Sequence, residues 1–297
     1  MKALPFLSLL PRLPGPRFPA ALLGATVLEL VVLTGHLVAY PFGLTQERRT
    51  QPDPPPETTP GAAPGAAPGT PGTHPNRLPG SPAAERPVVL LHGFIDNRSV
   101  FVLLRRTLAR HGRRHLASLN YSPLTRDLRT AAGLLGRHVE EVCARTGQRE
   151  VDIVGHSLGG LIARYYVQRL GGDRRVRTLV TLGTSHGGTA VAPGAGIHPI
   201  VRQMRGGSAL IEELRRPAPG CRTRFVSFWS ELDQVMVPVQ TACVDHPDLD
   251  AVNVRVTGIG HLALPVHPAV AAAVGEALET QETREGTAPS TGTSSVA

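Results

Sequence analysis

The chain has 297 residues, of which 41% are hydrophobic, and it carries a formal net charge of +8. Lys2 is its single lysine, so arginine supplies nearly all of the positive charge, and alanine, glycine and proline are abundant. Such a bias is typical of a GC-rich coding sequence rather than of a basic binding surface, and no nucleic-acid-binding motif is recognisable. We therefore expect no nucleic acid partner, and one domain of about 200 residues between the two chain ends.

The first segment of the chain is predicted to be a membrane anchor. Residues 20–40 are mostly apolar, are preceded by three basic residues, and approach the roughly 20 residues of a membrane-spanning helix. Because no clean Ala-x-Ala cleavage site follows, we predict an uncleaved anchor in the cell membrane within residues 1–43, with the rest of the chain outside. Cleavage as a signal peptide, followed by secretion, is the alternative. Glu29 and His36 interrupt the apolar run seven residues apart, which indicates a packing or interfacial face of the helix.

The next segment, residues 44–85, is rich in proline, glycine and alanine. A chain of this composition cannot bury enough apolar surface to fold, so we predict a disordered spacer that holds the following domain away from the membrane. Residues 281–297 are rich in threonine, serine and glycine and are predicted to form a disordered tail. The folded, catalytic domain is thus expected at residues 86–280.

The first predicted elements of this domain are a buried strand and a helix. Residues 87–91 form a continuous apolar run, which is typical of a strand covered on both faces, and His-Gly-Phe follows at 92–94. A helical pattern covers residues 134–144, where Cys143 is expected to be a buried free thiol.

The most informative motif is G-x-S-x-G at residues 155–159, with Ser157 at its centre. A β-branched run at residues 151–154 predicts a strand before it, and apolar residues at helical spacing up to Leu170 predict a helix after it. A serine at such a junction lies on a tight turn with its hydroxyl exposed above a sheet, and the flanking glycines leave room for the strained turn. Ser157 is therefore a candidate nucleophile.

A serine hydroxyl needs a general base and an acid that orients this base. Residues 224–230 are a predicted strand, and Glu231 and Asp233 follow it directly. The next predicted strand, residues 253–256, leads into a loop that carries His261. We expect His261 to be the base and Asp233 its partner, with Glu231 as the alternative acid.

Two backbone N–H groups are expected to bind the oxyanion. In hydrolases with the order serine, acid, histidine, one donor belongs to the residue after the nucleophile, here Leu158. The other comes from a loop after an early strand, and Phe94 occupies that place. His92 in the same loop is expected to shape it through hydrogen bonds rather than to transfer protons.

These motifs resemble those of bacterial lipases and esterases of the α/β-hydrolase superfamily, close to the secreted or membrane-attached triacylglycerol lipases of actinobacteria. The likeness extends from residue 86 to 278 and is carried by the runs at residues 91–94, 96–101, 155–160, 181–189 and 260–261. Residues 233–238 also resemble the acid loop of these enzymes, which favours Asp233 over Glu231. The resemblance implies an α/β-hydrolase fold with a mostly parallel central sheet and helices on both faces, and ester hydrolysis through an acyl-enzyme.

Two features of the sequence have more than one interpretation. Residues 190–219 mix glycine and proline with apolar residues, which suits either a lid or acyl-binding wall or an ordinary connecting helix packed on the sheet. Cys221 and Cys243 bracket the acid loop, and we expect a disulfide between them if the domain is exported. No Cys/His set has the spacing of a metal site and no glycine-rich phosphate loop is present, so we expect no metal and no cofactor.

Taken together, the residues predict a carboxylic ester hydrolase of the lipase or esterase type, which acts on a small-molecule or lipid ester through Ser157, His261 and Asp233. The nearest alternative is an acyltransferase or thioesterase that uses the same triad. A non-catalytic surface-binding protein that retains the fold is the alternative from a different class, although a binding role requires none of these three residues.

Overall fold

A single parallel sheet organises the part of the chain that the structure describes. The computed structural model describes residues 17–43, 86–94, 96–121, 125–190 and 198–286. The six described strands lie in the order β2-β1-β3-β4-β5-β6, and every neighbouring pair is parallel. Their bounds are β1 Val88–Leu91, β2 Leu116–Leu119, β3 Val151–His156, β4 Val176–Leu182, β5 Arg224–Ser230 and β6 Asp250–Val256. Because all the strands are parallel, the loops that follow them lie at the same end of the sheet, next to the carboxyl ends of the strands.

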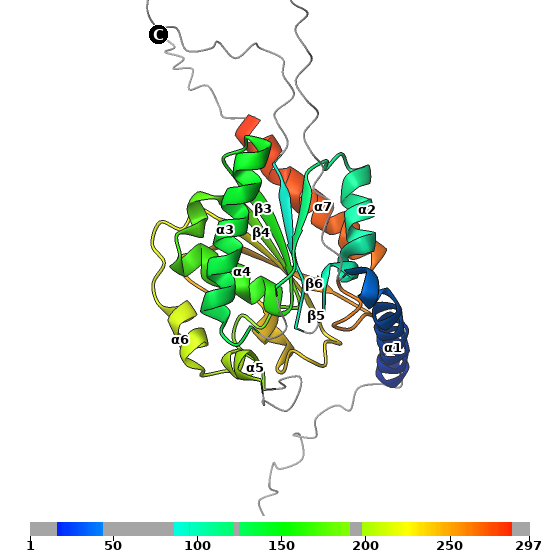
Figure 1. The fold of residues 1–297 in the computed structure, drawn as a ribbon. Coiled ribbons are helices and arrows are strands. Elements are labelled where there is room, and N and C mark those ends of the chain that lie inside the picture. The colour runs from blue at the N-terminus through cyan, green and yellow to red at the C-terminus, as the bar shows by residue number, and fades with distance from the viewer. Residues whose placement is uncertain (1–16, 44–85, 95, 122–124, 191–197, 287–297) are drawn as a thin grey trace, which may run out of the picture.

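Helices cover both faces of the sheet (Figure 1). On one face α3 and α4 pack side by side, with α6 next to α4 and α5 next to α6, and on the other face α2 packs against α7. The helices are α1 Arg17–Gly43, α2 Val102–Arg110, α3 Leu128–Thr146, α4 Leu158–Arg169, α5 Pro199–Gln203, α6 Ala209–Arg215 and α7 Pro268–Gly286. Short 3₁₀ helices are η1 Arg98–Phe101, η2 Gly172–Arg174 and η4 Val239–Ala242.

The two layers of core follow from the alternation of side chains along each strand. In β1, Val89 and Leu91 join the apolar cluster under α3 and α4, whereas Val88 and Leu90 join the cluster under α2 and α7. All four side chains are fully buried. The continuous apolar run of this strand is therefore the signature of a central strand with two covered faces.

The predicted elements are present, and the main differences lie at their ends. β5 has the predicted bounds, whereas β6 begins at Asp250, three residues before the predicted start. α3 is longer than predicted because Asp127 caps its first turn by accepting a hydrogen bond from Thr130 N. α7 continues to Gly286, past residue 280, where we expected the domain to end.

Helix α1 lies against the folded domain (Figure 1). It contacts η1, and Leu28 and Val32 pack on the apolar cluster of the α2 and α7 face. Helix α1 and the catalytic domain are therefore in contact in this structure. The physical reason lies in the polar side chains of α1, whose partners belong to the domain.

Candidate active site

Ser157 lies on the turn between β3 and α4, in a backbone conformation that few residues adopt. Its φ is 52° and its ψ is −119°, and it is the one non-glycine residue with positive φ in the described part of the chain. Such a conformation costs of order 1–3 kcal/mol and persists only where the surrounding structure holds it. Ser157 N donates to Leu182 O of β4 at 2.9 Å, and Thr184 Oγ1 donates to Ser157 O at 3.0 Å.

The glycines of the motif are there because three backbones meet at this turn. A Cβ on Gly155 would lie 2.5 Å from the Cα of Gly160, and one on Gly159 would overlap the carbonyl oxygens of Leu91 and His92 at the end of β1. These neighbours are backbone atoms of a central strand and a helix, so they cannot move aside. The spacing of the motif is therefore set by the close packing of β1, β3 and α4.

The predicted base and acid are brought together by the loops after β5 and β6. Nδ1 of His261 lies 2.8 Å from Oδ2 of Asp233, and both side chains are nearly fully buried. The other carboxylate oxygen of Asp233 accepts hydrogen bonds from Val235 N and Met236 N at 2.8 and 2.9 Å. Glycine is also needed at position 183, where a Cβ would lie 3.0 Å from His261 Nδ1. The acid is thus fixed on both oxygens, and one of them faces the imidazole.

The alternative acid lies elsewhere. Glu231 forms an ion pair with Arg255, whose side chain is largely exposed at the edge of the sheet on β6. The acid next to His261 is Asp233, two residues further along the chain.

Burial and charge shift the pKa values of the pair in opposite directions. Burial lowers the pKa of His261, but the adjacent Asp233 charge and its hydrogen bond, with smaller contributions from Glu29 and Asp96, outweigh burial and leave this pKa above its ordinary 6.5. For Asp233, burial raises the pKa, but His261 and the two backbone N–H donors hold it below its ordinary 3.8. The arrangement favours an imidazole that accepts a proton while its carboxylate partner stays ionised.

Leu158 directly follows Ser157 in the chain, and Phe94 lines the same cavity as Ser157. Leu158 is the first residue of α4, where backbone N–H groups have no acceptor within the helix. Gly93, one residue before Phe94, is so close to Ser157 that a Cβ on it would lie 3.3 Å from the serine Cβ. His92 has the structural role expected of it, because Nδ1 lies 2.9 Å from Gly93 O and its ring stacks on Tyr121 with centroids 4.4 Å apart.

A cavity of about 800 Å³ opens above these residues. Ser157, His261 and Phe94 line it, together with apolar side chains such as Met204 and Leu232. This volume lies toward the upper end of the roughly 300–1,000 Å³ typical of small-molecule pockets. The cavity is the space in which a substrate would reach the serine hydroxyl.

Two cavity residues had no role in the sequence analysis. Asp96 Oδ2 lies 3.5 Å from Nδ1 of His156, and Nε2 of His156 lies 3.3 Å from the backbone oxygen of His261. Burial raises the pKa of Asp96, but the two histidines His156 and His36 outweigh it and lower this pKa below 3.8. His156 is the variable residue before the serine in the motif, so the pattern itself gave no reason to single it out.

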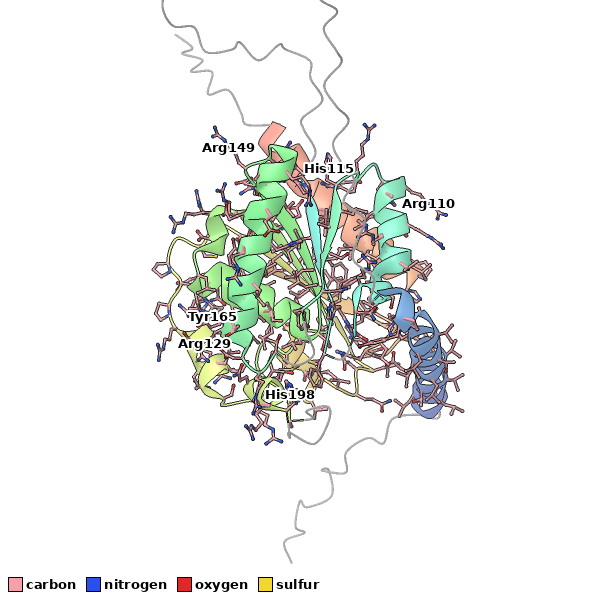
Figure 2. All side chains as sticks on the ribbon, in the orientation of Figure 1. Arg110, His115, Arg129, Arg149, Tyr165 and His198 are labelled. Carbon is pink, nitrogen blue, oxygen red and sulfur yellow. The ribbon has the colours of Figure 1, made fainter. Side chains whose placement is uncertain are left out.

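The segment at residues 190–219, between β4 and β5, is packed where the structure describes it. Arg129 of α3 and Tyr165 of α4, labelled in Figure 2, both bind the carboxylate of Glu213 in α6, at 2.7 and 2.8 Å. Leu210, Ile211 and Leu214 of the same helix are buried in the core under α3 and α4. The described part of this segment is therefore packed against the domain in this structure, and residues 191–197 lie outside the described residues.

The disulfide that we expected is wrong, because Cys221 and Cys243 are free thiols. Ala242 O accepts a hydrogen bond from Ser227 in the middle of β5, which places Cys243 beside that level of the strand. Cys221 precedes β5. The first residue of this strand, Arg224, is three positions before Ser227, which alone corresponds to about 10 Å. Disulfides need Cα atoms within about 7 Å. Cys143 is a buried free thiol as predicted, and burial raises its pKa.

Comparisons with known proteins agree with this fold. Residues 87–219 match the model of the palmitoyl protein thioesterase family. Among solved structures, the mature form of lipase BlEst2 from Bacillus licheniformis superimposes with a TM-score of 0.57, over 68% of this chain and 96% of that one, at 14% sequence identity. The chain has the α/β-hydrolase fold.

Two further structures support the same fold. Lipase B of Aspergillus fumigatus gives a TM-score of 0.59 at 15% identity, over 66% of this chain, which spans about half of the fungal enzyme (52%). A gene product of Listeria innocua gives 0.53 at 16% identity, over 66% of this chain and 94% of that one. The fold class predicted from the sequence is thus confirmed.

Proposed function

We propose that this protein is a serine hydrolase that cleaves carboxylic esters through an acyl-enzyme. The observation that carries the proposal is the hydrogen bond between His261 and Asp233 beside a serine on a strained turn, all three on the loops at one edge of the sheet. A role limited to binding requires neither the strained serine nor a buried acid–base pair.

In this mechanism Ser157 Oγ attacks the ester carbonyl carbon while Nε2 of His261 takes the hydroxyl proton. The backbone N–H groups of Phe94 and Leu158 stabilise the oxyanion, each worth roughly 3–4 kcal/mol in related enzymes. The protonated imidazole passes its proton to the leaving alcohol, which departs and leaves the acyl group on the serine. Water then gives a proton to His261 and attacks the acyl carbon; the imidazolium returns this proton to Ser157 Oγ as the carboxylic acid leaves, which regenerates the free serine. Asp233 orients the imidazole and stabilises its charge throughout.

Labelling by a fluorophosphonate, which reacts with activated serines, tests the proposal. The full-length protein should be labelled on Ser157 and should hydrolyse p-nitrophenyl butyrate, and both activities should be lost in Ser157→Ala. A protein that stays unlabelled and inactive, or a Ser157→Ala variant that keeps the wild-type rate, would contradict it.

A second candidate is thioester hydrolysis by the same residues. The match of residues 87–219 to a family named for palmitoyl protein thioesterase activity favours it over transfer to an alcohol. Comparing kcat/KM for a palmitoyl thioester and a palmitoyl oxyester separates the two. We expect the oxyester, including lipid esters such as triacylglycerol, to be the better substrate. A ratio that favours the thioester after correction for its higher intrinsic reactivity would assign the protein to the second candidate.

We further propose that α1 attaches the protein to the cell membrane through the face that points away from the domain, with the catalytic domain on the outer side. α1 contains a segment, Leu22–Pro41, that is long and apolar enough to cross a membrane, a test that a signal sequence passes as well. Its large apolar side chains away from the domain support attachment, because Leu23, Val31 and Val38 are 63–70% exposed.

Sedimentation and N-terminal sequencing test the attachment. The full-length protein should sediment with membranes and keep α1. A new N-terminus between residues 39 and 50, with active enzyme in the medium, would mean a secreted protein instead.

A further inference from the structure

One face of helix α1 closes the side of the catalytic cavity. The α1 residues that line it recur every three or four positions, so they lie on one face of the helix. Tyr40 lies 14 positions after Thr26, so this face extends for about 21 Å. Its apolar part consists of Leu30, Leu33 and Leu37, and across the cavity lie Ser157 and His261. We call this the pocket face of α1.

Polar contacts hold the pocket face to the domain along its whole length. Near its start, Gln234 Nε2 donates to Thr26 Oγ1 at 3.4 Å. Near its end, Asn97 Nδ2 donates to Tyr40 O at 2.9 Å, and His36 lies 3.9 Å from Asp96. Polar side chains are rare in a helix that contacts only lipid, because each is costly there. Here they have partners in the catalytic domain.

The central contact reaches the loop of the catalytic histidine. The carboxylate of Glu29 accepts hydrogen bonds from Leu262 N at 2.8 Å and Ala263 N at 2.9 Å, the two residues after His261. On the other side of His261, a Cβ on Gly260 would lie 2.7 Å from the carboxylate carbon of Glu29. The loop therefore packs around this one side chain before and after the histidine.

We propose that α1 forms part of the active site: its pocket face is one wall of the acyl-binding cavity, and Glu29 is a positioning residue for His261. The proposal rests on the proposed ester hydrolysis and specifies its substrate class, esters with a long acyl chain. A short acyl group would occupy only the part of the cavity near Ser157. A long chain would extend along Leu30, Leu33 and Leu37, and each buried methylene adds to binding.

A chain-length series on the full-length protein tests the acyl wall. Leu33→Trp fills the cavity from the pocket face, and Val31→Trp places the same side chain on the outer face, two residues away. We expect Leu33→Trp to lower kcat/KM for p-nitrophenyl palmitate about tenfold or more while p-nitrophenyl butyrate changes less than about twofold. Val31→Trp should leave both substrates within about twofold. Equal losses in the two variants, or no loss with palmitate in Leu33→Trp, would overturn the wall.

Substitutions of Glu29 test the positioning role separately. Glu29→Ala should lower kcat for both esters about tenfold with little change in KM for butyrate, because the histidine loop loses its anchor. Glu29→Gln keeps one acceptor oxygen and should recover part of this loss. Its loss of charge should also move the acidic limb of the kcat/KM profile to lower pH, since Glu29 helps to raise the pKa of His261. An unchanged profile together with wild-type kcat in both variants would rule the role out.

Two readouts separate failure of this inference from failure of the proposed function. Fluorophosphonate labelling of every variant reports whether a reactive serine is present, whatever the chain-length profile. The cysteine pair Thr26→Cys with Gln234→Cys should form a linked peptide detectable by mass spectrometry, whereas Val31→Cys with Gln234→Cys should not. A labelled, active protein without the first link would disprove docking of α1, and a linked but unlabelled protein would disprove the hydrolase.

Discussion

The carboxylate of Asp233 binds three groups at once: Nδ1 of His261 on one oxygen and the backbone N–H groups of Val235 and Met236 on the other. Backbone N–H groups of its own loop therefore hold the Asp233 carboxylate in place independently of its hydrogen bond to His261. A side chain fixed in this way keeps the imidazole in one tautomer and one orientation, which is the task of the acid in a catalytic triad.

Substitution of the two neighbouring acids should have very different effects. We expect Asp233→Asn to lower kcat for p-nitrophenyl butyrate roughly 10³- to 10⁴-fold, since an amide facing Nδ1 favours the wrong tautomer. Glu231→Gln should stay within about twofold, because it breaks only a surface ion pair with Arg255. Steady-state kinetics on both variants decide the matter, and the reverse order would move the acid to Glu231.

The pH dependence of activity should report the raised pKa of His261. The base must be neutral to accept the serine proton, so kcat/KM should fall as the pH drops through this pKa, with a midpoint above 6.5. Asp233→Asn removes the largest raising influence and should move the residual activity's midpoint to lower pH. A midpoint below 6.5 in the wild-type protein would contradict the electrostatics of the pair.

The same shift has a consequence of definite sign for stability. A group whose pKa is raised on folding stabilises the fold fully below its unfolded pKa, and this contribution disappears as the pH rises through the folded pKa. The difference in Tm between the wild-type protein and His261→Gln should therefore shrink as the pH is raised through neutrality. A difference that grows over this range would mean that His261 is buried in its neutral form.

Two glycine substitutions distinguish close packing from ordinary helix propensity. Gly159→Ala should destabilise the fold by roughly 1–3 kcal/mol or more, because the new methyl group would overlap backbone carbonyls of β1. Gly133→Ala in α3 has open space at its Cβ and should instead stabilise by about 0.5–1 kcal/mol. Chemical denaturation gives the free energy of unfolding of both variants, and similar effects of the two changes would contradict the close packing at the turn between β3 and α4.

The three cysteines should all react as thiols. Alkylation of the denatured, unreduced protein should add three labels per chain, as counted by intact-mass measurement. One label per chain would mean that Cys221 and Cys243 are bonded after all.

The sequence predicted the features that depend on neighbours along the chain. An apolar run without polar alternation identified β1 as a central strand, and the expected parallel order of the strands then placed Ser157, Asp233 and His261 at one end of the sheet. What it missed depends on contacts between distant segments. The partners of Glu29 are backbone N–H groups more than 200 residues away, so nothing in the apolar pattern of α1 indicates them. Likewise, the position of Cys221 and Cys243 on either side of one loop gave no measure of the distance between them.

At Ser157 the requirement for a nucleophile conflicts with the stability of the fold, because the positive φ is unfavourable for a residue with a side chain. Glycine adopts a positive φ without the penalty that a side chain adds, so Ser157→Gly should relieve the turn and give a more heat-resistant protein with no nucleophile. In a directed-evolution experiment that selects for thermostability of the protein but not for activity, Ser157 should be among the first residues to be replaced. The serine would be retained only under selection for ester hydrolysis.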